Sequence, residues 1–554
     1  MLDLTASSLA NSLNVPHLVA RIAVSRGIKT VSEFHALLYG KASSVLDPFS
    51  MFGMKEAVEW ILKVKESNES LFIFGDYDLD GLSSVALLVR GLSSLGIPVK
   101  WRLPNRFGAG YGLSIDAIDE MLSAGAQKLI TVDTGITANA EIAYAKEKGL
   151  CTMVIDHHQP SGEGLPCCDV LLDPHQEQDS YKNKDLCGVG VAYKFLCALY
   201  STLNLTLPEN FLELVALGTL ADLVPMTPEN RFFTRTGLLK MWESPFPGIK
   251  EICHSQLQFP QFMGAQGIIF KVAPLLNAPG RMEKPDPALD LLLCNNKESA
   301  PLLVKNLSSW NAKRKNKENE ISKMAIQRVK ELYGNDLPPV LVIDGYDWHL
   351  GVIGIVAAKM TQEFNRPSAV LSIQPDGVAS ASARAIPGFN WHKALFECRD
   401  LFSRWGGHAN AAGFSIAKEN IDLLRNKLNE NVSAFQDTTI QTNTLPPIDV
   451  AFSELDDSLM LWLSRMEPLV GKFASPIFRA SQVSISSLRE LRGGHLYLEL
   501  SQNTSARFSA IAFGMGKKKK EIVSLGKYIS VDFEIAWNVF NGRRSLQLQV
   551  KNIF

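Results

Sequence analysis

The sequence predicts an α/β protein with two αβ domains joined by a long helix and followed by a small β-barrel. From about residue 55, short apolar runs alternate with amphipathic helical stretches, which is the pattern of βα units around a parallel sheet. A polar helix-forming stretch follows at about 300–335, and the C-terminal part alternates apolar and polar residues as strands do. At 554 residues, the chain exceeds the size at which one hydrophobic core stops growing.

We expect five segments along the chain. They are an N-terminal helical cap (1–50), a first αβ domain (51–295), a bridging helix (296–335), a second αβ domain (336–435) and a barrel (436–554). The strands of the first sheet are expected at 71–74, 99–103, 128–132 and 151–155. Within residues 311–320 of the bridging helix only Ala312 is apolar. A helix this polar usually crosses between domains through solvent.

Composition narrows the classes of function. The 56 basic and 57 acidic residues balance, so no overall field attracts a polyanion, and any nucleic acid must bind at local patches. The eight cysteines contain no CxxC pair, which argues against a zinc site or a disulfide framework. The sequence shows no leader and no apolar run long enough for a membrane span. We therefore expect a cytoplasmic protein that is not bound to a membrane.

Acidic and imidazole side chains follow three of the predicted strands. The carboxyl ends of parallel strands share one edge of a sheet, where sites in open α/β folds usually lie. Buried like-charged carboxylates repel one another, and divalent cations remove that conflict. Mixed carboxylate and imidazole ligands without thiolate suit manganese or magnesium, and a pair of such ions suits phosphodiester hydrolysis. The candidate residues are Asp76, Asp78 and Asp80 after the first strand, Asp133 after the third, and His157 and His158 after the fourth.

Each candidate also has a structural alternative. A lone acid such as Asp133 after a strand is often a helix N-cap, and the triplet that contains His157 and His158 is compatible with a solvated turn. Three such sites, each at the end of an apolar run, favour the metal interpretation. Asp76 and His158 are either ligands or residues that orient a neighbouring ligand by a hydrogen bond.

The motifs GDYDLDG, VDTGI and DHH, in this order, resemble those of the DHH family of phosphodiesterases. The segments LCGVGVAYKFLCAL and LVALGTLADLVPMTPENR resemble the continuation in RecJ-type exonucleases, and GGHANAAGFSI is similar to the DHHA1 domain of the same family. The resemblance covers nearly the whole chain. It implies a 5′ to 3′ exonuclease that degrades single-stranded DNA to nucleoside 5′-monophosphates.

The resemblance also implies roles for particular residues. Asp78, Asp80, Asp133, His157 and Asp222 would hold two divalent cations, Mn²⁺ or Mg²⁺, with Asp133 bridging both. From its surroundings alone, Asp222 is better interpreted as an acid at a helix end before Pro225.

Substrate contacts follow from the same resemblance. His408 would reach the scissile phosphate from the second domain, although a buried loop histidine is the alternative. The pocket for the terminal phosphate would consist of Arg281, Ser382 and Arg384. Arg106 is a weaker candidate, whose alternative is a local cap or ion pair, and Gly407 and His408 of the GGHA motif are further substrate contacts. Leu79 and Ala385 depart from the family pattern. Neither difference removes a ligand, so both concern the fine geometry of the site rather than its activity.

The barrel resembles an OB fold, which binds single strands by a basic groove and stacking aromatic side chains. The resemblance further implies that the protein acts in DNA repair and recombination beside a helicase and a single-strand-binding protein. We expect the enzyme to be a monomer. Two rival functions remain. The first is a phosphodiesterase that acts on short oligonucleotides or cyclic dinucleotides, for which the chain is unusually long. The second is a scaffold without activity, although every expected ligand is present.

Overall fold

The computed structural model describes residues 2–40, 42–67, 69–104, 112–160, 162, 164–260, 263–430, 432–435, 445–503, 506–540 and 543–554. Arg106, a predicted substrate contact, lies outside these residues. Within the described ranges, no helix combines the length and the apolar character that a membrane crossing requires.

The first domain contains a five-stranded sheet in the order β2-β1-β3-β4-β5, with every neighbouring pair parallel. Its strands are β1 (Leu71–Gly75), β2 (Val99–Arg102), β3 (Lys128–Val132), β4 (Cys151–Ile155) and β5 (Val170–Leu172). The first four confirm the strands expected from the apolar runs. The short strand β5 was not expected, because three residues are too few to produce a recognisable pattern.

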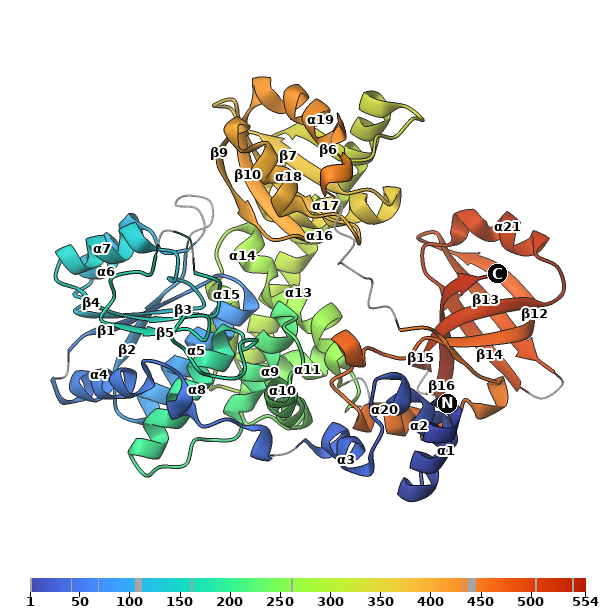
Figure 1. Ribbon diagram of the computed structural model, residues 1–554, viewed down its shortest axis with the longest axis horizontal. Helices are drawn as coiled ribbons and strands as arrows, with labels where there is room; N and C mark the ends of the chain where they lie inside the picture. The colour runs from blue at the N-terminus through green and yellow to red at the C-terminus, as the bar shows by residue number, and fades with distance from the viewer. Residues whose placement is uncertain are drawn as a thin grey trace.

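Helices cover both faces of this sheet (Figure 1). On one face, the core contains side chains from α6 (Ile115–Ser123) and α7 (Asn139–Glu147). On the other, it contains side chains from α4 (Met54–Ser67), α5 (Leu79–Ser94) and α8 (Gly188–Thr202). Behind these lie α9 (Phe211–Asp222), α10 (Pro228–Met241), α11 (Pro247–Leu257) and α15 (Asp286–Leu293). Helix α9 is apolar on all sides and is buried accordingly.

A single helix, α16 (Ala300–Tyr333), joins the two αβ domains. The expectation that its polar middle is solvated was wrong in one respect. Arg314 and Glu318 are buried, and they form an ion pair at 2.8 Å. Lys359 of α17 (Leu350–Phe364) pairs with the same Glu318 carboxylate. The buried charges therefore attach the bridging helix to the second domain.

The second domain has a mixed sheet in the order β6-β7-β8-β10-β9, in which only β6 and β7 are parallel. Its strands are β6 (Leu341–Tyr346), β7 (Ser368–Ile373), β8 (Val378–Arg384), β9 (Phe402–Gly407) and β10 (Ala411–Ala417). Helix α17 packs on one face, and α18 (Trp391–Glu397) and α19 (Ile421–Glu430) pack on the other.

The C-terminal domain is a ring of strands. Its strands are β11 (Ile448–Asp449), β12 (Phe478–Leu491), β13 (His495–Gln502), β14 (Ala506–Ala512), β15 (Ile529–Phe540) and β16 (Arg543–Ile553). They follow the order β11-β12-β13-β14-β16-β15, and a further pairing of β12 with β15 closes the ring. We describe it as a ring rather than as the regular barrel that the sequence predicted.

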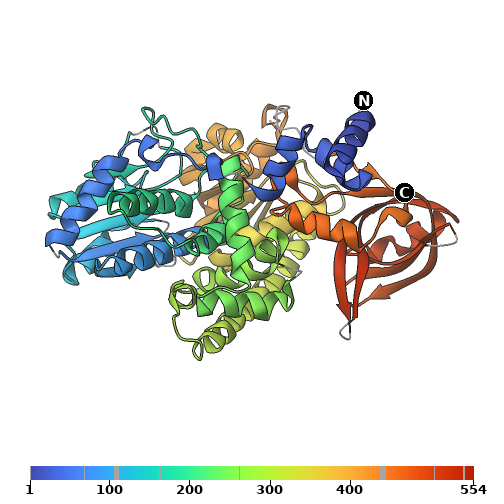
Figure 2. The same cartoon turned by 90° about the horizontal axis from the view of Figure 1, so that it is seen from below.

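The N-terminal helices α1 (Leu2–Leu13), α2 (His17–Ser25) and α3 (Val31–Tyr39) lie beside the C-terminal domain (Figure 2). Arg26 Nη2 donates a hydrogen bond to the carbonyl of Ala474 at 2.5 Å. Arg231 of α10 donates to the carbonyls of Leu37, Met466 and Pro468. The half-buried Arg26 and the buried Arg231 thus connect the cap, the first domain and the C-terminal domain.

The first domain also contains a buried ion pair between Lys194 and Glu229, with N and O atoms 3.1 Å apart. Replacing Lys194 by Met leaves Glu229 as an unpaired buried charge, so we expect a loss of about 3–5 kcal/mol in the free energy of unfolding. The control is Lys240→Met, which breaks the partly exposed pair with Glu209 and should cost less than about 1 kcal/mol. Thermal unfolding of both variants checks this, and equal losses would contradict it.

Candidate metal centre

The predicted ligands lie at the carboxyl-terminal edge of the first sheet. Asp76 and Asp78 follow β1, Asp133 follows β3, and His157 and His158 follow β4. Asp80 lies in the first turn of α5, and Asp222 is the last residue of α9. The structure therefore brings seven predicted side chains from four segments of the chain to one place.

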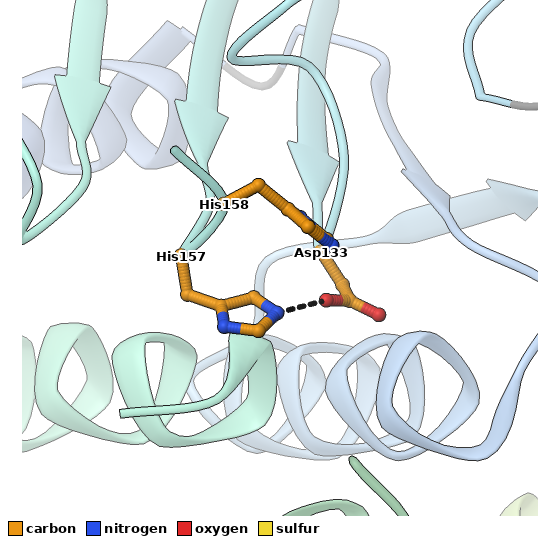
Figure 3. Close-up of side chains that lie close together, drawn as sticks. All are labelled: Asp133, His157 and His158. Atoms are coloured by element: carbon orange, nitrogen blue, oxygen red, sulfur yellow. Dashed lines mark ion pairs between the residues drawn. The ribbon is translucent and has the colours of Figure 1, made fainter. Parts of the chain in front are cut away.

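His157 lies at the centre of this group. Its Nε2 atom is 3.1 Å from Asp133 Oδ1 and 3.9 Å from both Asp80 Oδ2 and Asp222 Oδ2. Figure 3 shows the imidazole of His157 pointing toward the Asp133 carboxylate. Three sets of side chains have ligand atoms within 4.8 Å of one another: Asp133, His157 and His158; Asp80, His157 and Asp222; and Asp76, Asp78 and Asp133. Asp133 and His157 each belong to two sets, so the sets form one continuous cluster.

Asp80 is held by the backbone of α8. Its carboxylate accepts hydrogen bonds from the N–H groups of Gly188 and Val189 at 2.7 and 3.0 Å. These groups belong to the amino-terminal end of α8, where the helix dipole favours negative charge. Asp78 caps α5 by accepting from the N–H groups of Asp80 and Gly81 at 2.9 and 3.2 Å. Both carboxylates are thus oriented before any ligand binds.

Two glycines leave room for the carboxylates. A Cβ atom at Gly188 would lie 2.6 Å from Asp133 Cβ, and one at Gly218 would overlap Asp80 Oδ1. Neither glycine was predicted to be part of the site. Their role depends on which helices pack against the sheet edge, which no local pattern reports.

Asp133 has an unusual backbone and an unsatisfied oxygen. Its φ of 59° lies in the left-handed region, which is uncommon for residues other than glycine and often marks functional sites. The side chain is buried, and among the described residues its Oδ1 atom accepts no well-aligned hydrogen bond; its nearest polar neighbour is His157 Nε2 at 3.1 Å. A buried carboxylate oxygen in this position is costly unless a cation satisfies it.

Asp156 supports the two histidines and was not among the predicted site residues. Its buried carboxylate accepts from the N–H groups of Ile136 and His157 at 2.9 and 2.8 Å and lies 2.8 Å from His158 Nδ1. Burial alone would raise the pKa of Asp156, but the hydrogen bond and charge of His158 outweigh burial and lower it. Burial alone would lower the pKa of His158, and the same contact raises it to about 9. The Asp156 contact supports an orienting role for His158.

The remaining carboxylates repel one another. Burial, followed by the charges of Asp222 and Asp78, raises the pKa of Asp80 to about 8. Burial and the charges of Asp80, Asp78 and Asp76 raise the pKa of Asp133 well above its usual range. Burial and then the charge of His158 lower the pKa of His157, which favours a neutral imidazole that can bind a metal. Hard oxygen donors, one central imidazole and the bare oxygen of Asp133 together fit divalent cations such as Mn²⁺ or Mg²⁺.

A cleft of about 720 Å³ extends from Asp78 toward the second domain. Arg281 of α14 (Ala278–Met282) lines it, and so do Ser382 and Arg384 of β8 and Gly407 at the end of β9. Arg384 Nη1 donates to Ser382 Oγ at 3.0 Å. The structure thus brings four predicted substrate contacts from two domains to one cleft.

His408 is placed differently from the expectation. Its side chain is exposed in the turn between β9 and β10, and His408 is not among the described residues that line the cleft. Within the described part of the chain, no hydrogen bond or ion pair joins the side chain to the carboxylate cluster. Its contact with the scissile phosphate remains a prediction.

Asn277 lines the same cleft and was not predicted. Its Oδ1 atom is buried and has no hydrogen-bond partner among the described residues. The sequence carried a signal for it, since Asn277 lies four residues before Arg281 in the motif VAPLLNAPGRM.

Comparisons with known proteins agree with this arrangement. Residues 70–219 match the DHH family N-terminal domain, residues 337–434 match the DHHA1 domain, and residues 448–552 match the RecJ OB domain. The single-stranded-DNA-specific exonuclease RecJ of Bacillus subtilis (strain 168) is 33% identical over 98% of this chain and 69% of its own length. RecJ of Escherichia coli (strain K12) is 30% identical over 98% of this chain and 96% of its own. The chain belongs to the RecJ family.

Solved RecJ structures share the fold. The Mn²⁺ complex of RecJ from Thermus thermophilus superimposes with a TM-score of 0.82 at 24% identity, covering 100% of this chain and 78% of that one. A second structure, exonuclease RecJ bound to manganese, has a TM-score of 0.61 at 29% identity and covers 74% of this chain and 100% of that one. The family and the fold predicted from the sequence are therefore confirmed.

The raised carboxylate pKa values predict a pH-dependent response to metal. An unfolded aspartate has a pKa of about 3.9, so the metal-free folded chain binds more protons than the unfolded chain between about pH 4 and pH 8. Its stability therefore falls as the pH rises through this window. Cations compete with these protons, so Mn²⁺ should raise the thermal unfolding midpoint more at pH 8 than at pH 6.

Asp133→Asn is the matched variant, because asparagine tolerates the left-handed backbone. It removes one repelling carboxylate, so the metal-free variant should unfold at a higher temperature than the wild type at pH 8. The variant should also gain less from Mn²⁺. An equal gain from Mn²⁺ in both proteins would show that Asp133 is not a ligand.

Proposed function

We propose that this chain is a metal-dependent exonuclease that hydrolyses single-stranded DNA from its 5′ end and releases nucleoside 5′-monophosphates. The observation that carries the proposal is the cluster around Asp133 and His157, which opens into a cleft lined by Arg281 and Arg384. Relatives at 30–33% identity over 98% of the chain are named single-stranded-DNA-specific exonucleases, and a RecJ structure at 29% identity is bound to manganese.

Two divalent cations bound at this cluster would neutralise charge on the phosphoryl oxygens and lower the pKa of the attacking water. We propose that Asp78, Asp80, Asp133, His157 and Asp222 hold them, with Asp76 and His158 as ligands or orienting residues. The hydrogen bonds from α8 to Asp80 fix its carboxylate before substrate arrives. Asp156 fixes the backbone of His157 and the ring of His158 in the same way.

The second domain would bind the end of the strand. Arg281 and Arg384 can each bind phosphate oxygens through a planar guanidinium group, and Ser382 adds a hydroxyl next to Arg384. A terminal nucleotide between this pocket and the metal cluster places its 3′ phosphodiester at the reacting position. Because the cleft lies between two domains, it favours a single strand over a duplex.

The wider context is also proposed. The match to the RecJ OB domain at residues 448–552 supports single-strand binding by the C-terminal domain. We further propose that the protein acts in DNA repair and recombination in the cytoplasm, as a monomer that works beside a helicase and a single-strand-binding protein. This part of the proposal rests on the family resemblance. Full-length similarity to RecJ proteins favours this function over a phosphodiesterase for short oligonucleotides or cyclic dinucleotides.

The activity is tested with Mn²⁺ and end-labelled single-stranded DNA, with matched duplex, RNA and dinucleotide substrates as controls. Only single strands with a free 5′ end should shorten. Asp133→Asn should stay folded and lower kcat by on the order of 10³-fold or more, as loss of an essential catalytic group does. Turnover of dinucleotides with long strands left intact would instead favour the small-substrate function.

The terminal phosphate pocket has a separate test. Arg384→Gln should reduce the preference for a 5′-phosphate over a 5′-hydroxyl end by about 10-fold, the loss expected for one charge-assisted hydrogen bond. The control is Arg366→Gln in the same domain, whose guanidinium has, among the described residues, one hydrogen bond, to the carbonyl of its neighbour Asn365. A loss of activity that is equal for both kinds of end would contradict the assignment.

A further inference from the structure

The cleft continues past the terminal phosphate pocket, beside α17, over the face of the second sheet on which that helix packs. Alternate residues of β8 and β10 are buried on the other face, among them Ala379, Ala383, Phe414 and Ile416. The residues between them face the cleft, and they include Ser380, Ser382, Arg384, Gly413 and Ser415. Strand β9 forms the edge of this sheet, and β10 lies between it and β8 (Figure 1). The cleft is therefore a surface with room for more than one phosphate.

Strand pairing places the far end of this surface at Arg404. Arg384 pairs with Ala411, whereas Ser380 and Arg404 both pair with Ser415. Arg404 is therefore displaced from Arg384 by two strands and four positions, which is roughly 10 Å across the sheet and roughly 13 Å along it. The cleft thus has one cationic end beside the metal cluster and a second cationic end farther out.

Arg404 is available to bind a ligand. Its side chain is exposed and lines the cleft, and it has no hydrogen-bond or ion-pair partner among the described residues. Arg384, by contrast, already donates to Ser382 and to the carbonyl of Ala383. Free guanidinium groups are suited to phosphate oxygens.

The lining of the far end favours an anion over a base. Ser380, Ser415 and Gly406 offer hydroxyl groups and open backbone near Arg404. Trp405 borders the cleft, but its ring packs against His392 and Phe396 at centroid distances of 5.4 and 6.3 Å. A volume of about 720 Å³ also lies in the range, roughly 300–1,000 Å³, of sites that hold whole small ligands.

We propose that Arg404, with Ser380 and Ser415, binds anionic groups that lie beyond the 5′-terminal phosphate, so that the enzyme accepts single strands with a 5′-polyphosphate end. The inference rests on the proposed function, because that function places the rest of the strand on the opposite side of the metal cluster. Whatever occupies the surface past the terminal phosphate pocket must therefore extend the 5′ end.

The chemistry is the same hydrolysis with a different first product. Water adds to the phosphorus of the first internucleotide phosphodiester, and the bond from that phosphorus to the 3′ oxygen of the terminal nucleotide breaks. The 3′ oxygen takes a proton, and a nucleoside 5′-triphosphate leaves. The remaining strand carries a 5′-phosphate and is degraded as before.

The test compares single strands of one sequence with 5′-monophosphate and 5′-triphosphate ends. The wild type should cleave both, and Arg404→Gln should lower kcat/KM for the triphosphate strand by about 10-fold, as expected for one charge-assisted contact. The same variant should change kcat/KM for the monophosphate strand less than about 2-fold, near the limit of such a comparison. Arg399→Gln, at an exposed arginine that packs on Phe396 of α18, is the control and should change neither.

A binding measurement separates this inference from catalysis. In the Asp133→Asn background, fluorescence anisotropy should show that Arg404→Gln weakens binding of the triphosphate strand alone. Equal effects on both strands, no effect on either, or a wild type that rejects the triphosphate end would each overturn the inference. Failure to cleave the monophosphate strand would instead overturn the proposed function.

Discussion

Repulsion among buried carboxylates at one sheet edge is the constraint on which the rest of the site depends. Asp76, Asp80 and Asp133 are all buried, and Asp78 and Asp222 lie beside them. Such a group is unstable as a set of bare anions. Burial, followed by the charges of Asp222 and Asp78, raises the pKa of Asp80 to about 8. The protein maintains this arrangement at a cost in stability, and divalent cations offset that cost.

The surrounding structure prevents the carboxylates from relaxing away from one another. Backbone N–H groups of α8 fix Asp80, and Asp156 orients the histidine pair. Close packing of Gly188 against Asp133 leaves that side chain little freedom to turn aside. The left-handed backbone of Asp133 is a further cost that the fold sustains at this position. Each of these features is understandable as preorganisation of a metal site.

Much of the site could be predicted from sequence because it follows from one rule of geometry. Asp78, Asp133 and His157 come directly after apolar runs, and parallel strands bring their carboxyl ends together. Asp222 has no such signal, because an acid at the end of a helix is common for local reasons, so only the family resemblance identified it. Asp156 was visible in the DHH triplet, but its supporting role appears only when the partners of its carboxylate are known.

Features that depend on how helices and domains pack could not be predicted. The buried pair of Arg314 and Glu318 lies in a stretch whose composition indicates a solvated helix. The exposed position of His408 depends on how far the two domains lie apart, which no motif records. Arg404 becomes a candidate only when the walls of the cleft are known.

The most direct test of the central claim is the number of Mn²⁺ ions bound per chain, measured by equilibrium dialysis at pH 8 with electron paramagnetic resonance of the bound ions. The account predicts two ions in the wild type with magnetic coupling between them, because Asp133 would bridge both, and loss of that coupling in Asp133→Asn. One uncoupled ion in the wild type, or the same two coupled ions in Asp133→Asn, would contradict it.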